Sequence, residues 1–88
     1  TAIEYLKKAL ELSPDNIQIL NNLGATHLAV FNTKEAEKYY DRAYQLDSDL
    51  AITNYNIGIF NHVLKRDIEA IPFLEKAYEN DPSVSYLE

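Results

Sequence analysis

Apolar residues recur along the chain at the spacing of amphipathic helices. In residues 17–30 and again in residues 34–47, apolar side chains fall three or four places apart, which is the period of a single helical face. A break at Phe31, Asn32 and Thr33 separates the two segments. The pattern therefore predicts a pair of helices joined by a short turn.

The same helix pair returns after 34 positions. The only two glycines of the chain, Gly24 and Gly58, lie one such period apart. The same shift superimposes further residues, namely Leu23 on Ile57, Glu35 on Glu69, Ala36 on Ala70, Ala43 on Ala77, Tyr44 on Tyr78 and Asp47 on Asp81. A fixed period of roughly 20 to 50 residues is typical of stacked repeats that share a continuous core.

The period predicts how the chain is organised. We expect a single repeat domain over residues 1–88, with a half repeat at 1–16, whole repeats at 17–50 and 51–84, and the start of a further helix at 85–88. The half repeat corresponds to a second helix that lacks its own first helix. Boundary residues lie at equivalent places, which are Pro14, Ser48 and Pro82.

Polar residues and one proline bear on where the second helices begin. Thr33 and Asp67 occupy equivalent places, and side chains of their type cap helix N-termini. A Glu follows each of them within the first turn, where a negative charge is favourable. Pro72 lies about one turn into the last helix, where it lacks an N–H donor. We therefore expect that helix to start late or to bend.

These features resemble the tetratricopeptide repeat family over essentially the whole chain. The resemblance rests on the 34-residue period, a small motif in the first helices (Leu23-Gly24 and Ile57-Gly58), the spacing A-x3-Y/L-x2-A in the second helices, and a terminal proline. It implies an all-α fold, in which antiparallel helix hairpins stack into an α-α superhelix, a right-handed solenoid. About two and a half repeats are present.

The sequence departs from the family pattern at five positions. Leu20 and Asn54 stand where the family favours Trp, and His27 and Asn61 stand where it favours Tyr. Ser48 replaces a proline. None of these changes removes a packing residue that both repeats need.

Small residues mark the places where the helices of each hairpin are expected to cross. Gly24 pairs with Ala36 in one repeat, and Gly58 pairs with Ala70 in the next. A glycine inside a helix costs about 1 kcal/mol relative to alanine. Both glycines therefore indicate a close approach between helices.

Composition and charge exclude several classes of function. Eight basic residues face fourteen acidic ones, giving a net charge of −6, so we expect no nucleic-acid partner. No apolar run approaches the roughly 20 residues needed to cross a bilayer, so we expect no membrane partner. The chain has no cysteine and no phosphate-binding loop or nucleophile motif. We expect no enzyme activity, cofactor or metal, and the compartment stays open.

The distribution of charge points to a binding surface. None of the charged residues lies in 17–30 or 51–64, the first helices of the whole repeats. By resemblance to the family, first helices line the concave surface on which partners usually lie. The predicted partner-binding groove is Gln18, Asn21, Asn22, Ala25, Leu28 and Ala29, with Ile52, Tyr55, Asn56, Ile59, His62 and Val63.

The chemistry of this set narrows the partner. Family members that clamp the acidic C-terminus of a chaperone use Lys, Arg and Asn, and this set has no cation, so we expect a different protein or peptide. Asn22 and Asn56 are either an amide ladder for a peptide backbone or local hydrogen-bonding residues. Tyr55 and Ile59 either anchor a ligand or pack on a neighbouring helix.

The two histidines carry weaker signals. His27 falls where the family has an aromatic residue, which favours a buried or half-buried histidine with satisfied hydrogen bonds over a ligand-binding one. His62 belongs to the predicted groove, without a second histidine beside it in the pattern, so a metal site is not expected.

Three functions compete at this point. The first is a protein-interaction scaffold that binds a peptide or helical segment in an uncharged groove. The second is a structural module that forms homo-oligomers through exposed repeat faces, because the half repeat leaves Ile3, Leu6 and Leu10 short of a neighbour. The third and remotest is a helical-repeat RNA binder, which predicts salt-sensitive binding of single strands.

Overall fold

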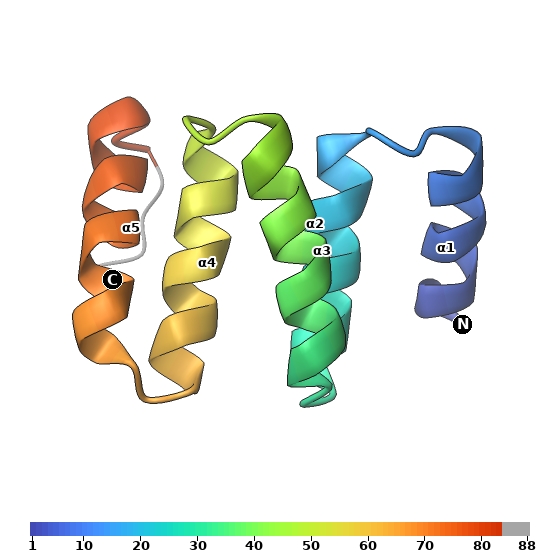
Figure 1. Ribbon diagram of the computed structural model, residues 1–88, viewed down its shortest axis with the longest axis horizontal. Helices are drawn as coiled ribbons and strands as arrows, with labels where there is room; N and C mark the ends of the chain where they lie inside the picture. The colour runs from blue at the N-terminus through green and yellow to red at the C-terminus, as the bar shows by residue number, and fades with distance from the viewer. Residues whose placement is uncertain (84–88) are drawn as a thin grey trace. The chain divides into compact units, whose positions relative to one another are not determined.

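The computed structural model describes residues 1–83, which form five helices. These are α1 (Ala2–Leu12), α2 (Ile17–Ala29), α3 (Thr33–Leu46), α4 (Ala51–Val63) and α5 (Asp67–Asn80) (Figure 1). They belong to two compact units, residues 1–46 and residues 47–88, which we describe one at a time. The expected start of a helix at 85–88 lies outside the described residues.

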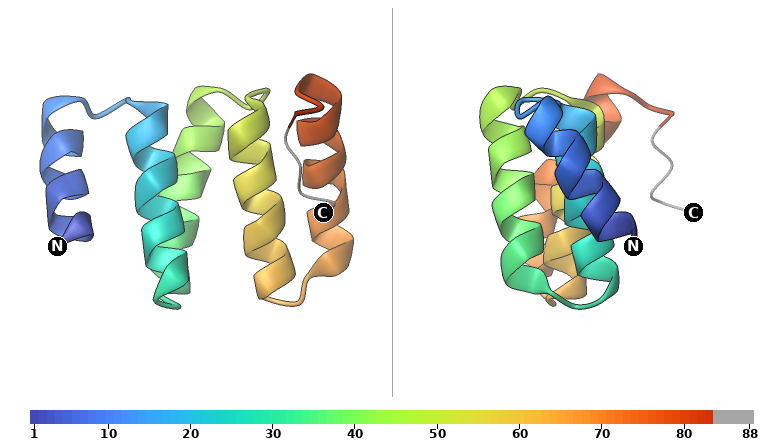
Figure 2. Two further views of the ribbon diagram at one scale, coloured as in Figure 1. Left: turned by 180° about the vertical axis from the view of Figure 1, so that it is seen from behind. Right: turned by 90° about the vertical axis from the view of Figure 1, so that its right-hand side faces the viewer.

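The first unit contains α1, α2 and α3. Helices α2 and α3 lie side by side as an antiparallel hairpin, and α1 packs against α2 (Figure 2). The core holds Leu20, Leu23, Tyr39 and Ala43, and partly buried side chains from α1 and α2 pack around it. Residues 1–16, which were expected to form a half repeat, contain one helix, α1.

The second unit is the antiparallel hairpin of α4 and α5 (Figure 1). Its buried apolar residues include Ile57 and Phe60 on α4 and Ala70 and Ala77 on α5. Each whole repeat is thus one helix hairpin, which confirms the expected all-α fold of paired antiparallel helices.

Each glycine lies against a side chain from the other helix of its hairpin. A β-carbon at Gly24 would come within 2.6 Å of Tyr40 Cδ1, and one at Gly58 would come within 2.5 Å of Leu74 Cδ2. Tyr40 and Leu74 are themselves one repeat period apart. The expected close approach is confirmed, and the facing group is mainly a side chain rather than backbone.

The turn inside each hairpin has the same backbone conformation. Phe31 and Lys65 have positive φ angles of 60° and 62°. In the first turn the Asn32 amide donates to the His27 carbonyl and the Phe31 amide donates to the Leu28 carbonyl. These two bonds form a Schellman motif, which closes a helix C-terminus around a left-handed residue.

The start of α5 differs from the expectation drawn from Asp67 and Pro72. The N-cap residue is Arg66, whose side chain makes no capping bond, and Asp67 is the first residue of the helix. Thr33 is likewise the first residue of α3 and not its cap, so both capping predictions are wrong by one position. Because α5 begins at the equivalent of Thr33, Pro72 does not delay its start. Pro72 lies inside the helix and removes one hydrogen bond from it.

Equivalent ion pairs join each second helix to the segment before its first helix. Arg42 Nη2 lies 3.0 Å from Asp15 Oδ1, and Lys76 Nζ lies 2.9 Å from Asp49 Oδ1. Both pairs are largely exposed, so each contributes no more than about 1 kcal/mol. The two pairs lie at equivalent places, and each joins the second helix of its hairpin to the segment that precedes the first helix.

Candidate partner-binding surface

One exposed stripe runs along α2. Gln18, Asn22, Ala25 and Ala29 are exposed, and their spacing of three or four residues places them on one face of the helix. Leu28, beside them, is half-buried. This stripe carries no charge and combines small apolar groups with two amides.

Helix α4 carries the equivalent stripe, one repeat period further along the chain. Ile52 and Val63 are exposed, and Tyr55, Asn56 and Ile59 between them are half-buried. The α4 stripe is also uncharged at neutral pH, but it is more apolar than the α2 stripe. Together the two stripes contain most of the residues predicted to line the groove.

Asn21 is the exception, because it lies in the interior. Only 4% of its surface is exposed, so the prediction that it lines the binding surface is wrong. Asn21 shares a side of α2 with Ile17 and Gly24, one turn away in either direction. That side is covered in the first unit, whereas its equivalent Tyr55 in α4 is half-buried.

Some asparagine side chains form hydrogen bonds with the backbone nearby, and others form no such bond. Asn16 Oδ1 accepts from the Ile19 amide, and Asn54 Nδ2 donates to the Ser48 and Leu50 carbonyls. Asn61 likewise donates to the Ile57 carbonyl. These three side chains satisfy local backbone groups.

The side chains of Asn22 and Asn56 behave differently. Within residues 1–83 neither side-chain amide makes a hydrogen bond to another part of the chain. The backbone carbonyl of Asn22 accepts the Thr26 hydroxyl, at 2.8 Å. Local hydrogen bonding of the side chains therefore does not account for Asn at these two positions.

The histidines occupy contrasting places. His27 is buried, as expected, with its ring stacked on Tyr39 at 5.6 Å between centroids. Its Nδ1 is 3.4 Å from Asn32 Nδ2, and its Nε2 has no hydrogen-bond partner among the described residues. His62 is exposed on α4, and its Nδ1 lies 2.7 Å from Asp67 Oδ1, across the turn to α5.

Charged side chains lie on the other helices and in the connecting segments, and on α3 they shift several pKa values. On α3 the Lys38 ammonium lies 3.0 Å from Glu35, and this hydrogen bond lowers the pKa of Glu35 and raises the pKa of Lys38. Burial raises the pKa of Asp41, and the nearby Glu37 carboxylate adds to the effect. The uncharged stripes thus contrast with a strongly charged α3.

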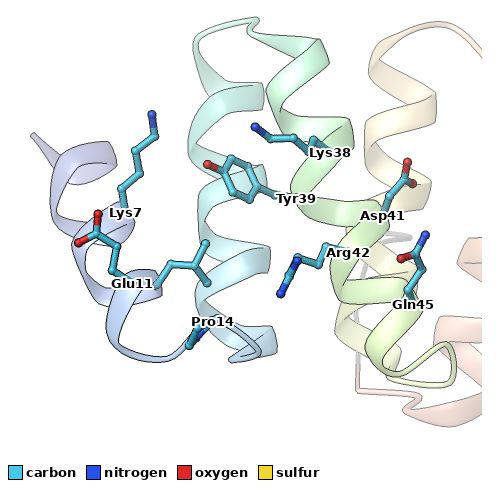
Figure 3. Close-up of a pocket in the computed structure, with 9 residues that line it drawn as sticks. Lys7, Glu11, Pro14, Lys38, Tyr39, Asp41, Arg42 and Gln45 are labelled. Atoms are coloured by element: carbon cyan, nitrogen blue, oxygen red, sulfur yellow. The ribbon is translucent and has the colours of Figure 1, made fainter.

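Sequence reasoning missed a hollow in the first unit, between α1 and α3 (Figure 3). It has a volume of about 680 Å³. It is lined by Lys7, Leu10, Glu11, Pro14, Lys38, Tyr39, Asp41, Arg42 and Gln45. The apolar residues of the half repeat were the only feature of the sequence that indicated an exposed surface on α1, and they did not show where a hollow would lie.

The arrangement supports binding chemistry. In the described part of the chain no group of three or more His, Asp or Glu side chains is placed to hold a metal ion. The uncharged stripes offer amide donors and acceptors beside apolar surface, which suits contact with a polypeptide. Residues 1–83 include no helix long and apolar enough to cross a membrane.

Comparisons with known proteins agree with the repeat. A family model described as TPR repeat matches residues 1–30, and another described as Tetratricopeptide repeat matches residues 17–50. Among curated proteins, Protein O-mannosyl-transferase Tmtc3 of Drosophila melanogaster is 31% identical over 78 residues, which is 89% of this chain. The chain spans 8% of the length of that relative.

Proposed function

This chain belongs to the tetratricopeptide repeat family, and we propose that the uncharged stripes of α2 and α4 hold an extended or helical segment of another protein. Repeats of this family mediate protein–protein interactions in general. The observation that carries the finer proposal is the pair of side-chain amides at Asn22 and Asn56, which make no bond within residues 1–83.

Each kind of residue on the stripes has a separate part in binding. The amides of Asn22 and Asn56 donate to and accept from peptide bonds, whatever side chains the partner carries. Ile52 and Ile59 supply apolar contact area, worth about 25 cal/mol for each Å² that the partner covers. Because no charge is involved, we expect affinity to change little with salt.

The transferase activity named for the Drosophila relative is not assigned to this chain. The chain covers 8% of that protein, and the proposed surface lacks the carboxylates that acid–base catalysis uses. We propose that these residues bind and position a partner, within whatever longer protein contains them. The partner is a polypeptide, and the lack of cations argues against an acidic chaperone C-terminus.

The test is a peptide ligand selected from an unbiased library, with affinity measured by calorimetry. Tyr55→Ala combined with Asn56→Ala should weaken binding by about tenfold or more, because it removes an anchor and an amide. Tyr44→Ala combined with Gln45→Ala is the matched control on α3 and should leave affinity unchanged. Equal affinity for the parent chain and the Tyr55/Asn56 variant, with both folded by circular dichroism, would refute the proposal.

Self-association is a second candidate, favoured by one observation on α1. Leu6 and Leu10, which were expected to lack a neighbour, instead pack partly buried against the core of the first unit, and Ile3 is half-buried. The exposed apolar side chains of α1 are Tyr5, which is 75% exposed, and Leu12, which is 87% exposed. A light-scattering mass that rises with concentration, and returns to one chain in Tyr5→Ser plus Leu12→Ser, would support it. A mass of one chain up to millimolar concentration would exclude it.

A further inference from the structure

Helix α5 carries a second exposed apolar surface, separate from the stripes. Ile68 is 83% exposed, Ile71 is 52% exposed and Tyr78 is 48% exposed. Pro72 is also exposed and lies one turn beyond Ile68. Ile68, Ile71 and Pro72 form an apolar patch on the first two turns, which we call the α5 patch.

The equivalent face of α3 is charged. Moving back by one repeat period replaces Ile68, Ile71 and Pro72 with Lys34, Glu37 and Lys38. Because α3 and α5 occupy the same place in their hairpins, an ordinary solvated surface at this position is polar. The apolar side chains of the α5 patch are therefore not required by the hairpin itself.

Charged side chains beside the α5 patch indicate which charge a binding partner carries. Glu75 and Glu79 follow Ile68 and Pro72 at helical spacing and are exposed on the same face. The nearby cation on the helix, Lys76, is paired with Asp49 at 2.9 Å. Lys65 and Arg66 lie in the turn before the helix, at the opposite end from these carboxylates.

Pro72 changes the hydrogen bonding of the helix at the patch. A proline has no N–H, so the Ile68 carbonyl lacks the donor that any other residue at position 72 would supply. Apolar side chains and two carboxylates thus occur on one face of α5.

We propose that this face docks an amphipathic segment of a partner protein, with apolar residues over the α5 patch and Lys or Arg over Glu75 and Glu79. Charge complementarity sets the direction, with the basic end of the segment towards the C-terminal end of α5. A second copy paired in the parallel sense would place Glu opposite Glu, and an antiparallel pair of copies is the alternative that the test distinguishes. This surface acts independently of the stripes on α2 and α4.

The test uses a synthetic amphipathic peptide about four turns long, with Leu on one half and Lys on the other. Binding to the whole chain is followed by nitrogen-15 chemical shifts and fluorescence anisotropy. Ile68→Ser with Ile71→Ser should weaken binding about tenfold, and Glu75→Lys with Glu79→Lys should do the same while favouring a peptide with Glu in place of Lys. Both changes are on the surface, so both variants should remain folded.

The control is Asn22→Ala with Asn56→Ala, which should leave affinity for this peptide unchanged. That result separates the α5 surface from the proposed stripes, since each can fail without the other. The proposal is overturned if the peptide does not bind, if its shifts fall on α2 or α4, or if the Ile68/Ile71 variant binds equally well. It is also overturned if the free chain forms a dimer that this variant abolishes, because the occupant would then be a second copy.

Discussion

At the scale of single residues, the glycines show how one facing side chain can dictate a position. Gly24 faces the rigid ring of Tyr40, whereas Gly58 faces Cγ and Cδ2 of the Leu74 side chain, which can change rotamer. The repeat in the sequence predicted that both positions need a small residue. It did not show that the Tyr40 ring and the Leu74 side chain differ in how easily they can move aside, because that depends on side-chain geometry.

We predict that Gly24→Ala destabilises the fold more than Gly58→Ala. The new β-carbon would come within 2.6 Å of the Tyr40 ring, and overpacking of this kind costs about 1–3 kcal/mol, which exceeds the gain of about 1 kcal/mol in helix propensity. Leu74 can rotate aside, so the gain should offset most of the cost at Gly58. Urea unfolding of both variants measures the difference, and an equal or smaller loss at Gly24 would contradict the argument.

Tyr40 makes stability depend on alkaline pH. Burial raises the pKa of its phenol from 10.0 to about 12, so the folded state holds this proton more tightly than the unfolded chain. This difference in pKa contributes about 2–3 kcal/mol to the free energy of unfolding. The contribution is complete below pH 10 and is lost as the pH rises from 10 towards 12.

The corresponding prediction is that Tyr40→Phe loses less stability than the parent chain between pH 9 and pH 12. Denaturant unfolding at the two pH values gives the comparison. The other tyrosines are present in both proteins and serve as the internal reference. Parallel losses in the two proteins would show that Tyr40 ionises as freely in the fold as in the unfolded chain.

At the scale of the helical elements, the turns hold residues in an unfavourable conformation. Phe31 and Lys65 have positive φ, where a side chain costs roughly 1 kcal/mol that glycine avoids. We predict that Lys65→Gly raises the free energy of unfolding by about 0.5–1 kcal/mol. Lys65→Ala is the matched control and should bring no gain, so a similar rise in both variants would point to lost charge as the cause.

Helix bounds were the most predictable feature at this scale. Residues 17–30 and 51–64 were expected as first helices, and α2 and α4 span Ile17–Ala29 and Ala51–Val63. Because the same pattern and turn occur twice, the helix bounds can be placed more reliably than from a single amphipathic segment. The cap of α5 was not predictable, since Arg66 and Asp67 both precede the apolar spacing and only the backbone decides between them.

The candidate surface was predictable in part. Absence of charge in residues 17–30 and 51–64 corresponds to uncharged stripes on α2 and α4 in the structure, and the repeat period relates the two stripes. The burial of Asn21 could not be read from the sequence, because its side of α2 also packs against other helices of the unit. The hollow between α1 and α3 was not predicted either, because most of its lining comes from two helices that are not consecutive in the sequence.

At the scale of the whole molecule, charge is distributed unevenly among the helices. Within residues 1–83, α2 and α4 carry no Asp, Glu, Lys or Arg, and these side chains lie on α1, α3, α5 and the segments that connect the helices. We propose that the uncharged stripes bind a partner polypeptide and that the charged helices keep the chain hydrated and folded. The α5 face adds a surface of a different chemical kind.

The most direct test is a nitrogen-15 chemical-shift map of the chain with a peptide ligand selected without bias. The account predicts that the largest shifts fall on Gln18, Asn22 and Ala25 and on their equivalents Ile52, Asn56 and Ile59, including the side-chain amides of Asn22 and Asn56. Shifts confined to α1, α3 or α5, with those side-chain amides unmoved, would contradict it.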